Sequence, residues 1–333
     1  MTMTRAIIID TDAGWDDWLA LLFLMKAPGL QILGVTVTGA GEAHLTPGMK
    51  NINGLLVFGG QSANVYPGAG KPLLYSNAFP GSFRTTVDGF WGLTIPPPPG
   101  QPGTSAISTK SAVDWLHETF LAAAKASAPV DVLCIGGFTN LAMLLAAHPL
   151  AEYQAGIGTI YTMAGAVNVP GNVVTAGDDL WSYYGSNTTA EWNVFIDAEA
   201  AKIVLRAGLR MVLVPLDATN DVPVTTDFVT AYGKAAGSDV YAGLVHQILL
   251  QQAGQTNFFD PLAAAVLATQ AASPLVTTTM MRLAVETELD EETNTVGALT
   301  STSDGTWTEV VVCTAANPTT FETLFTATTV PAR

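Results

Sequence analysis

Four aspartates, Asp10, Asp12, Asp16 and Asp17, fall within eight residues near the amino terminus. Carboxylates this close together repel one another, and the amino terminus of a helix offsets only about 0.3–1 kcal/mol per charge. A hard cation such as Ca²⁺ or Mg²⁺ relieves the repulsion, because both ions bind carboxylate oxygens. The spacing therefore favours a metal site over the simpler alternative, a helix cap with a solvated acidic loop.

The residues that flank the acids predict the elements that hold them. The apolar, β-branched run at residues 7–9 is typical of a buried parallel strand. After the acids, apolar side chains recur at helical spacing, at Trp18, Leu21, Leu22 and Met25. We therefore expect a turn from strand to helix, with Asp16 and Asp17 in the first helical turn and Gly14 supplying the backbone freedom for a tight bend.

Strand and helix patterns alternate along most of the chain and predict an α/β fold, with a mostly parallel central sheet and helices on both faces. Further strand patterns occupy residues 30–38, 130–135, 158–164 and 211–216. Two more, at residues 275–285 and 307–313, predict a small antiparallel addition near the carboxyl terminus. We expect a single domain over residues 1–333, with ligands bound beyond the carboxyl ends of the strands.

Several polar residues follow predicted strands or precede predicted helices. Glu191 and Asn193 are two positions apart, and in a strand they would share one face, offering an acceptor and a donor to vicinal hydroxyls. Asn172 lies in the loop after the strand at residues 158–164, and Asp260 precedes a proline as a predicted helix N-cap. A polar strand face, a turn residue and a helix cap explain the same residues without a ligand.

A long segment at residues 61–107 is rich in glycine, proline and aromatic residues. Long irregular segments are uncommon in compact domains and often serve as lids or binding loops. The aromatic side chains of this segment could form a ligand wall or pack locally.

The composition excludes several classes of protein. The 333-residue chain has a formal net charge of −15 with only 13 Lys and Arg, which argues against binding to nucleic acid or to an anionic membrane surface. Its two cysteines, Cys134 and Cys313, imply no disulfide framework. The first residues lack the apolar stretch of a signal peptide and no apolar run reaches transmembrane length, so we expect a soluble cytoplasmic protein.

The acidic segment resembles the Asp-x-Asp-x-x-x-Asp-Asp signature of the nucleoside hydrolase family, also called inosine-uridine preferring nucleoside hydrolases. The resemblance extends along almost the whole chain, through residues 135–140, 165–172, 190–193 and 259–262. It implies a Ca²⁺-dependent N-ribohydrolase that splits a nucleoside into ribose and a free base.

The resemblance also implies a role for each polar residue. The metal ligands would be the side chains of Asp12, Asp17 and Asp260 and the backbone carbonyl of Ile135. Asp12 would also act as general base on a water bound to the metal. The ribose hydroxyls would be held by Asp16, Asn172, Glu191 and Asn193. Asp10, at the end of the strand, would support the metal ligands from behind.

Subgroups of the family differ in how they treat the leaving base. In pyrimidine-accepting and nonspecific members a histidine precedes the last metal-binding aspartate, whereas this chain has Phe259 there. Purine-specific members sandwich the base between two aromatic side chains, and Phe83 and Phe259 occupy the matching positions. Stacking favours protonation of a purine at N7 without a side-chain acid. The resemblance therefore implies a purine nucleoside as substrate, a role in purine salvage, and a homodimer.

Two positions depart from the family's pattern. The loop after the second strand usually has an Asp or Asn for the ribose, but here Gly41 is followed by Glu42, so either Glu42 substitutes or one ribose contact is absent. Gly14 stands where purine-specific members have an Asn.

Other functions remain open from the sequence. Phosphatases of the haloacid dehalogenase type also begin with a strand and Asp-x-Asp, but they do not require the acidic pair at positions 16 and 17. A nucleoside- or sugar-binding protein without turnover would use the ribose contacts but would need no metal with a base beside it. A nonspecific or weakened family member would retain the metal site.

Overall fold

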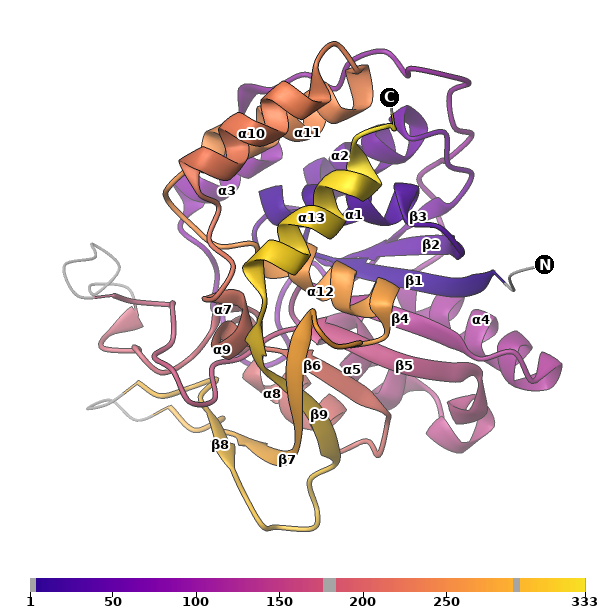
Figure 1. The fold of residues 1–333 in the computed structure, drawn as a ribbon. Helices are drawn as coiled ribbons and strands as arrows, with labels where there is room; N and C mark the ends of the chain where they lie inside the picture. Colours follow the sequence, from indigo (N-terminus) through magenta and orange to yellow (C-terminus); the bar gives the residue numbers. More distant parts are fainter. Residues whose placement is uncertain (1–3, 176–183, 290–293, 333) are drawn as a thin grey trace.

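The computed structural model describes residues 4–175, 184–289 and 294–332 of the chain. Within these ranges a nine-stranded sheet runs in the order β3-β2-β1-β4-β5-β6-β9-β7-β8 (Figure 1). The strands are β1 (Arg5–Thr11), β2 (Leu30–Val37), β3 (Asn64–Pro67), β4 (Val130–Cys134), β5 (Ile157–Met163), β6 (Met211–Val214), β7 (Val276–Val285), β8 (Leu299–Ser301) and β9 (Glu309–Ala316).

The pairing of the strands confirms the predicted sheet. β3, β2, β1, β4, β5, β6 and β9 pair in parallel along the sheet, whereas β7 is antiparallel to β9 and β8 is antiparallel to β7. The order reverses at β1, since β2 and β3 lie on one side of it and β4 and β5 on the other. Ligands of open α/β sheets bind at such a reversal, beyond the carboxyl ends of the strands.

The described part of the chain forms helices between most of the strands. They are α1 (Trp15–Lys26), α2 (Leu45–Phe58), α3 (Gly81–Asp88), α4 (Ala112–Ala126), α5 (Thr139–Ala147), α7 (Trp192–Ile196), α8 (Ala198–Leu205), α9 (Leu216–Thr219), α10 (Thr226–Ala236), α11 (Val240–Gln252), α12 (Phe259–Thr269) and α13 (Pro318–Thr329), with short 3-10 turns η1 (Phe90–Gly92), η2 (Leu150–Glu152) and η3 (Gln154–Gly156). None of these helices is long and apolar enough to cross a membrane.

Two helical layers cover the sheet, one on each face (Figure 1). Ile7 and Ile9 pack into the layer that contains α1, α2, α11, α12 and α13, whereas Ile8 packs into the layer that contains α4, α5 and α8. Successive side chains of a strand point to opposite faces, so a strand that is apolar throughout needs a layer on each side. The prediction of helices on both faces is confirmed.

The acidic segment lies between β1 and α1, as predicted, with Asp16 and Asp17 in the first turn of the helix. The expected role of Gly14 in the bend was wrong. Ala13 adopts the left-handed conformation, with φ of 62°, whereas Gly14 has an ordinary φ of −73°. The Ala13 N–H donates to the Thr11 hydroxyl (2.9 Å), which holds the bend.

Two further predictions differ from the structure. Residues 61–107 are more regular than expected, because they contain β3, α3 and η1. The prediction of Asp260 as an N-cap was wrong, since the N-cap of α12 is Phe258. The Phe258 N–H donates to the Val222 carbonyl (2.8 Å), which fixes the chain just before the helix and leaves Asp260 in its first turn.

Candidate active site

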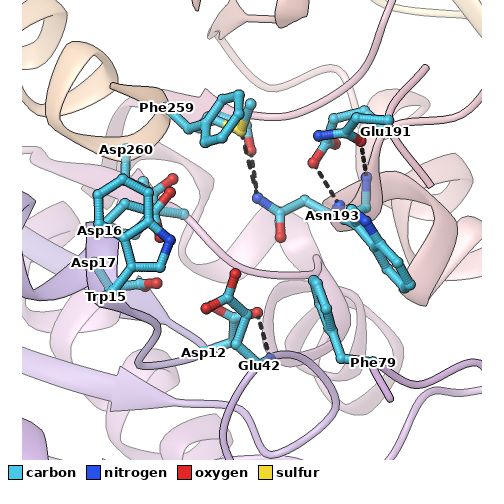
Figure 2. Close-up of a pocket in the computed structure, with 14 residues that line it drawn as sticks. Asp12, Trp15, Asp16, Asp17, Glu42, Phe79, Glu191, Asn193, Phe259 and Asp260 are labelled. Carbon is cyan, nitrogen blue, oxygen red and sulfur yellow. Dashed lines mark hydrogen bonds between the residues drawn. The ribbon is translucent and has the colours of Figure 1, made fainter. Parts of the chain in front are cut away.

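A cavity opens beside the turn between β1 and α1 (Figure 2). All of the predicted metal-binding and ribose-binding residues line it, although they come from distant parts of the chain. The lining consists of Asp12, Trp15, Asp16, Asp17, Glu42, Phe79, Ile135, Met163, Asn172, Glu191, Trp192, Asn193, Phe259 and Asp260.

Three carboxylates meet on one side of this cavity. Asp16, Asp17 and Asp260 each place one oxygen within 4.8 Å of the other two. Helices α1 and α12 pack against each other and bring these side chains together. Asp17 is held by the Thr11 hydroxyl and by the Gly14 N–H (2.8 Å), so its carboxylate also stabilises the start of α1.

Asp12 follows β1 directly and lies beside this cluster, next to Glu42 (Figure 2). Its Oδ2 accepts a hydrogen bond from the Glu42 N–H (3.0 Å), and its backbone carbonyl accepts one from Ala43 (3.1 Å). The charge of Asp12 also acts on Asp16, Asp17 and Asp260 and raises the pKa of all three carboxyl groups. Asp12 therefore lies beside the three-acid cluster and is hydrogen-bonded to the loop at residues 39–43.

Burial raises the pKa of each of these carboxyl groups. Loss of hydration raises the pKa of Asp16 to about 7, and the charge of Asp12 adds to the effect. Burial and the neighbouring acids raise the pKa of Asp17 and of Asp260 well above the usual range. No Lys, Arg or His is among the described residues that line the cavity. A hard divalent cation fits this all-oxygen set, which the carbonyl of Ile135 could complete.

Asp10 lies behind the cavity and is completely buried. Its carboxylate accepts hydrogen bonds from the Asn140 side chain (2.7 Å) and from the Thr36 hydroxyl, and the Cys134 thiol lies 3.9 Å away. Burial raises the pKa of Asp10 to about 6, although these donors oppose the shift. Asp10 thus ties β1 to its neighbours at the strand end from which Asp12 extends.

The prediction that Glu191 and Asn193 share a strand face was wrong. Helix α7 begins at Trp192, and Glu191 is its N-cap. The Glu191 carboxylate accepts hydrogen bonds from the N–H groups of Asn193 (2.8 Å) and Gly165 (2.7 Å), while burial raises the pKa of Glu191 to about 7. The Asn193 side chain donates to the Met163 carbonyl (2.9 Å), which turns its Oδ1 toward the cavity (Figure 2).

Asn172 reaches the same cavity from the loop after β5. Its Oδ1 accepts a hydrogen bond from the Trp192 N–H (3.2 Å), which orients its amide N–H₂ as a donor. Gly171 allows this approach, because a Cβ atom there would lie 2.1 Å from the Ala190 carbonyl oxygen. Asn172 and Asn193 therefore present a donor and an acceptor from two different segments.

Gly14 and Gly41, where the chain departs from the family's pattern, are both closely packed against acidic side chains of the site. A Cβ atom on Gly14 would lie 2.1 Å from Glu42 Oε2, and one on Gly41 would lie 1.8 Å from Asp12 Oδ2. Neither position therefore has room for Asp or Asn in this arrangement. Glu42 Oε2 is buried and has no hydrogen-bond partner among the described residues. Glu42 lies outside the three-acid cluster but lines the same cavity.

Aromatic side chains form the outer wall of the site. Phe79 stacks on Trp192, with ring centroids 4.0 Å apart, and on Phe83, with centroids 5.5 Å apart. Both predicted base-stacking residues, Phe83 and Phe259, line one hollow that adjoins the cavity. The full lining of this hollow is Glu42, Phe79, Pro80, Phe83, Asn172, Trp192, Thr256 and Phe259.

Sequence reasoning missed several residues of the site. Trp15, Met163 and Trp192 line the cavity, and each is adjacent in sequence to a strand end or to a residue already singled out. Phe79 was noted only within the aromatic segment. His246 packs against Tyr232, with ring centroids 6.4 Å apart, and lines neither the cavity nor the hollow.

Comparison with known proteins agrees with this geometry. The sequence profile described as inosine-uridine preferring nucleoside hydrolase matches residues 7–323. The chain belongs to this family. Its nucleoside hydrolase fold is also found in a crystal structure of an inosine-uridine preferring nucleoside hydrolase from Bacillus anthracis, with a TM-score of 0.76, 23% identity, and coverage of 97% of this chain and 98% of that one. A purine-preferring ribonucleoside hydrolase from Gardnerella vaginalis has a TM-score of 0.76, 22% identity and 97% coverage of both chains.

Several curated relatives of this nucleoside hydrolase family member bear names of the pyrimidine type. A probable uridine nucleosidase 2 from Arabidopsis thaliana is 31% identical over 225 residues, which are 67% of this chain and 62% of the relative. A pyrimidine-specific ribonucleoside hydrolase RihA from Shewanella sp. (strain MR-7) is 33% identical over 223 residues, again 67% of this chain and 62% of the relative. The match thus spans less than two thirds of the length of these relatives.

Proposed function

We propose that this protein is a metal-dependent N-ribohydrolase that cleaves the N-glycosidic bond of ribonucleosides. The observation that supports this most directly is one cavity in which a buried cluster of Asp16, Asp17 and Asp260 adjoins Asp12 and an aromatic hollow. A sugar-binding protein would need neither the carboxylate cluster nor a base beside it.

The metal would be held by Asp12, Asp17, Asp260 and the carbonyl of Ile135, and the position of Asp16 in the cluster makes it a further candidate ligand. Ca²⁺ suits an all-oxygen donor set of this kind. When bound, it would supply the positive charge that lowers the pKa of a coordinated water. Asp12 would take the proton of the attacking water, since its carboxylate lines the cavity beside the cluster and is held by the Glu42 N–H.

The remaining polar residues would hold the ribose. Asn193 Oδ1 and the remaining lone pairs of the Glu191 carboxylate accept hydrogen bonds from hydroxyls, and the Asn172 amide donates to one. The buried and unpartnered Oε2 of Glu42 would accept a further hydroxyl hydrogen bond. These carboxylates also surround the position where positive charge develops on the sugar, as in glycoside hydrolysis through an oxocarbenium-like transition state.

The base would lie in the aromatic hollow, and its chemistry supports a purine. Phe79, Phe83, Trp192 and Phe259 offer flat apolar faces, and no histidine is among the described residues that line the hollow. A purine can be protonated at N7 while it is stacked, whereas a pyrimidine lacks this atom and would need a side-chain donor. The names of the curated relatives favour a second candidate, hydrolysis of uridine.

A reducing-sugar assay over inosine, guanosine and uridine tests both parts of the proposal. We expect ribose release from the purine nucleosides, with kcat/KM for inosine at least about 10-fold above that for uridine, equivalent to about 1.4 kcal/mol of transition-state stabilisation. Equal or faster hydrolysis of uridine would replace the purine assignment by the second candidate. Absence of turnover on every nucleoside would overturn the hydrolase assignment itself.

A further inference from the structure

One arginine connects the aromatic hollow to the acidic cavity. Arg84 follows Phe83 in α3, and its Nη2 donates hydrogen bonds to the carbonyl oxygens of Gly39 (2.6 Å) and Ala43 (2.8 Å). These two carbonyls stand at the two ends of the short loop that contains Glu42. A single guanidinium group therefore holds both ends of this loop.

Helix α3 is fixed to the same region at its other end. The Asp88 carboxylate accepts a hydrogen bond from the His44 N–H (2.8 Å) and lies 2.6 Å from His44 Nδ1. The Asn51 side chain of α2 donates to the carbonyls of Val87 (3.2 Å) and Asp88 (3.3 Å). The helix that carries Phe83 and the loop that carries Glu42 are thus joined at several points.

The same loop is also hydrogen-bonded to Asp12. The N–H groups of Glu42 (3.0 Å) and Ala43 (3.1 Å) in this loop donate to Asp12. The loop therefore lies between α3 and Asp12, and its position determines where the unpartnered Oε2 of Glu42 points. Because a misplacement of about 1 Å can cost about 10²-fold in rate, this position matters to any reaction in the cavity.

Resting on the activity proposed above, we propose that Arg84 is a positioning residue that couples base binding in the aromatic hollow to the placement of Glu42 in the sugar cavity. A base stacked on Phe83 holds α3 in place, and Arg84 then holds the Glu42 loop. Arg84 lines neither the cavity nor the hollow, and its hydrogen bonds hold the loop that carries Glu42. Its positive charge also acts on Asp12 and lowers the pKa of that carboxyl group, against the rise caused by burial.

A double-mutant cycle tests this coupling through kcat/KM for inosine, measured for Arg84→Gln, Glu42→Gln and the combined variant. We expect Arg84→Gln to lower kcat/KM about 10- to 100-fold, and the combined variant to be no worse than Glu42→Gln alone. Thr86→Ala is the matched control, because Thr86 is exposed on the same helix. Losses that multiply in the combined variant would overturn the proposal, because Arg84 would then act independently of Glu42.

Amide hydrogen exchange supplies a readout that does not depend on turnover. Arg84→Gln should speed exchange at residues 39–43, while β1 amides and the Thr86→Ala control remain at the wild-type rate. Unchanged exchange at residues 39–43 would contradict the coupling. If Arg84→Gln does not fold, Arg84→Met keeps most of the apolar stem and gives the same comparison. A wild-type protein that hydrolyses no nucleoside would refute the proposed function, and the exchange experiment would still test whether Arg84 holds the Glu42 loop.

Discussion

At the scale of single residues, Asp12 differs from the other buried acids because it lies beside the three-acid cluster and is hydrogen-bonded to the Glu42 loop. Asp12→Asn keeps the size of the side chain but removes the proton acceptor. We expect kcat for ribose release to fall by about 10²–10⁴-fold, the usual contribution of a general base. Asp227→Asn, at an exposed position in the first turn of α10, is the control. Full activity of Asp12→Asn would contradict the assigned role.

Gly14 gives a second prediction at this scale. A methyl group at this position would displace the Glu42 carboxylate, which is the mobile end of a side chain, and Gly14 already has an ordinary φ of −73°. We therefore expect Gly14→Ala to leave the melting temperature nearly unchanged and to lower kcat/KM by about 10-fold. Gly243→Ala, where a Cβ atom would meet nothing within 4 Å, is the control. Wild-type kcat/KM in Gly14→Ala would show that Glu42 does not contact the substrate.

At the scale of elements, the N-cap of α7 links a site residue to stability. Glu191 is 2% exposed, and burial raises its pKa from 4.5 to about 7. The folded state therefore favours the protonated form, and the stability present below about pH 4.5 is lost as the pH rises through about 7. Without metal, the ionisation of Glu191 alone should lower the free energy of unfolding by roughly 3 kcal/mol as the pH rises through these two values.

Chemical denaturation in the presence of a chelator measures this effect. The free energy of unfolding should decrease from pH 4.5 to pH 8, and Glu191→Gln should decrease less steeply, because glutamine still offers an oxygen to the N–H groups of α7 but does not titrate. Glu288→Gln, at an exposed position, should keep the wild-type slope. A slope that Glu191→Gln leaves unchanged would refute the assignment of the shift to Glu191.

The elements that hold the acids could be predicted from the sequence because their patterns are local. The apolar run of β1 and the helical spacing after Asp17 predicted the turn, and both are confirmed. The start of α7 could not be predicted, because Glu191 and Asn193 at alternate positions fit a strand as well as an N-cap followed by a helix. The contacts that decide between them, with Gly165 and Met163, come from a distant strand end.

At the scale of the whole molecule, strand order and side-chain packing bring the site together. The sequence predicted parallel strands but not their order, because the pairing of distant strands leaves no local pattern in the sequence. The close packing of Glu42 against Gly14 could not be predicted for the same reason, since these two residues meet only after β1 and β2 pair. The resemblance to nucleoside hydrolases identified the residues of one cavity, whereas the stacking of Phe79 on Trp192 emerged only from the folded chain.

The central claim is that the buried carboxylates hold a metal ion that hydrolysis requires. The most direct measurement is the rate of ribose release from inosine by the same preparation before chelation, after removal of metal with a chelator, and after addition of Ca²⁺. We predict that chelation lowers the rate by at least about 10²-fold and that Ca²⁺ restores it. An undiminished rate in protein shown by metal analysis to be free of divalent cations would contradict the account.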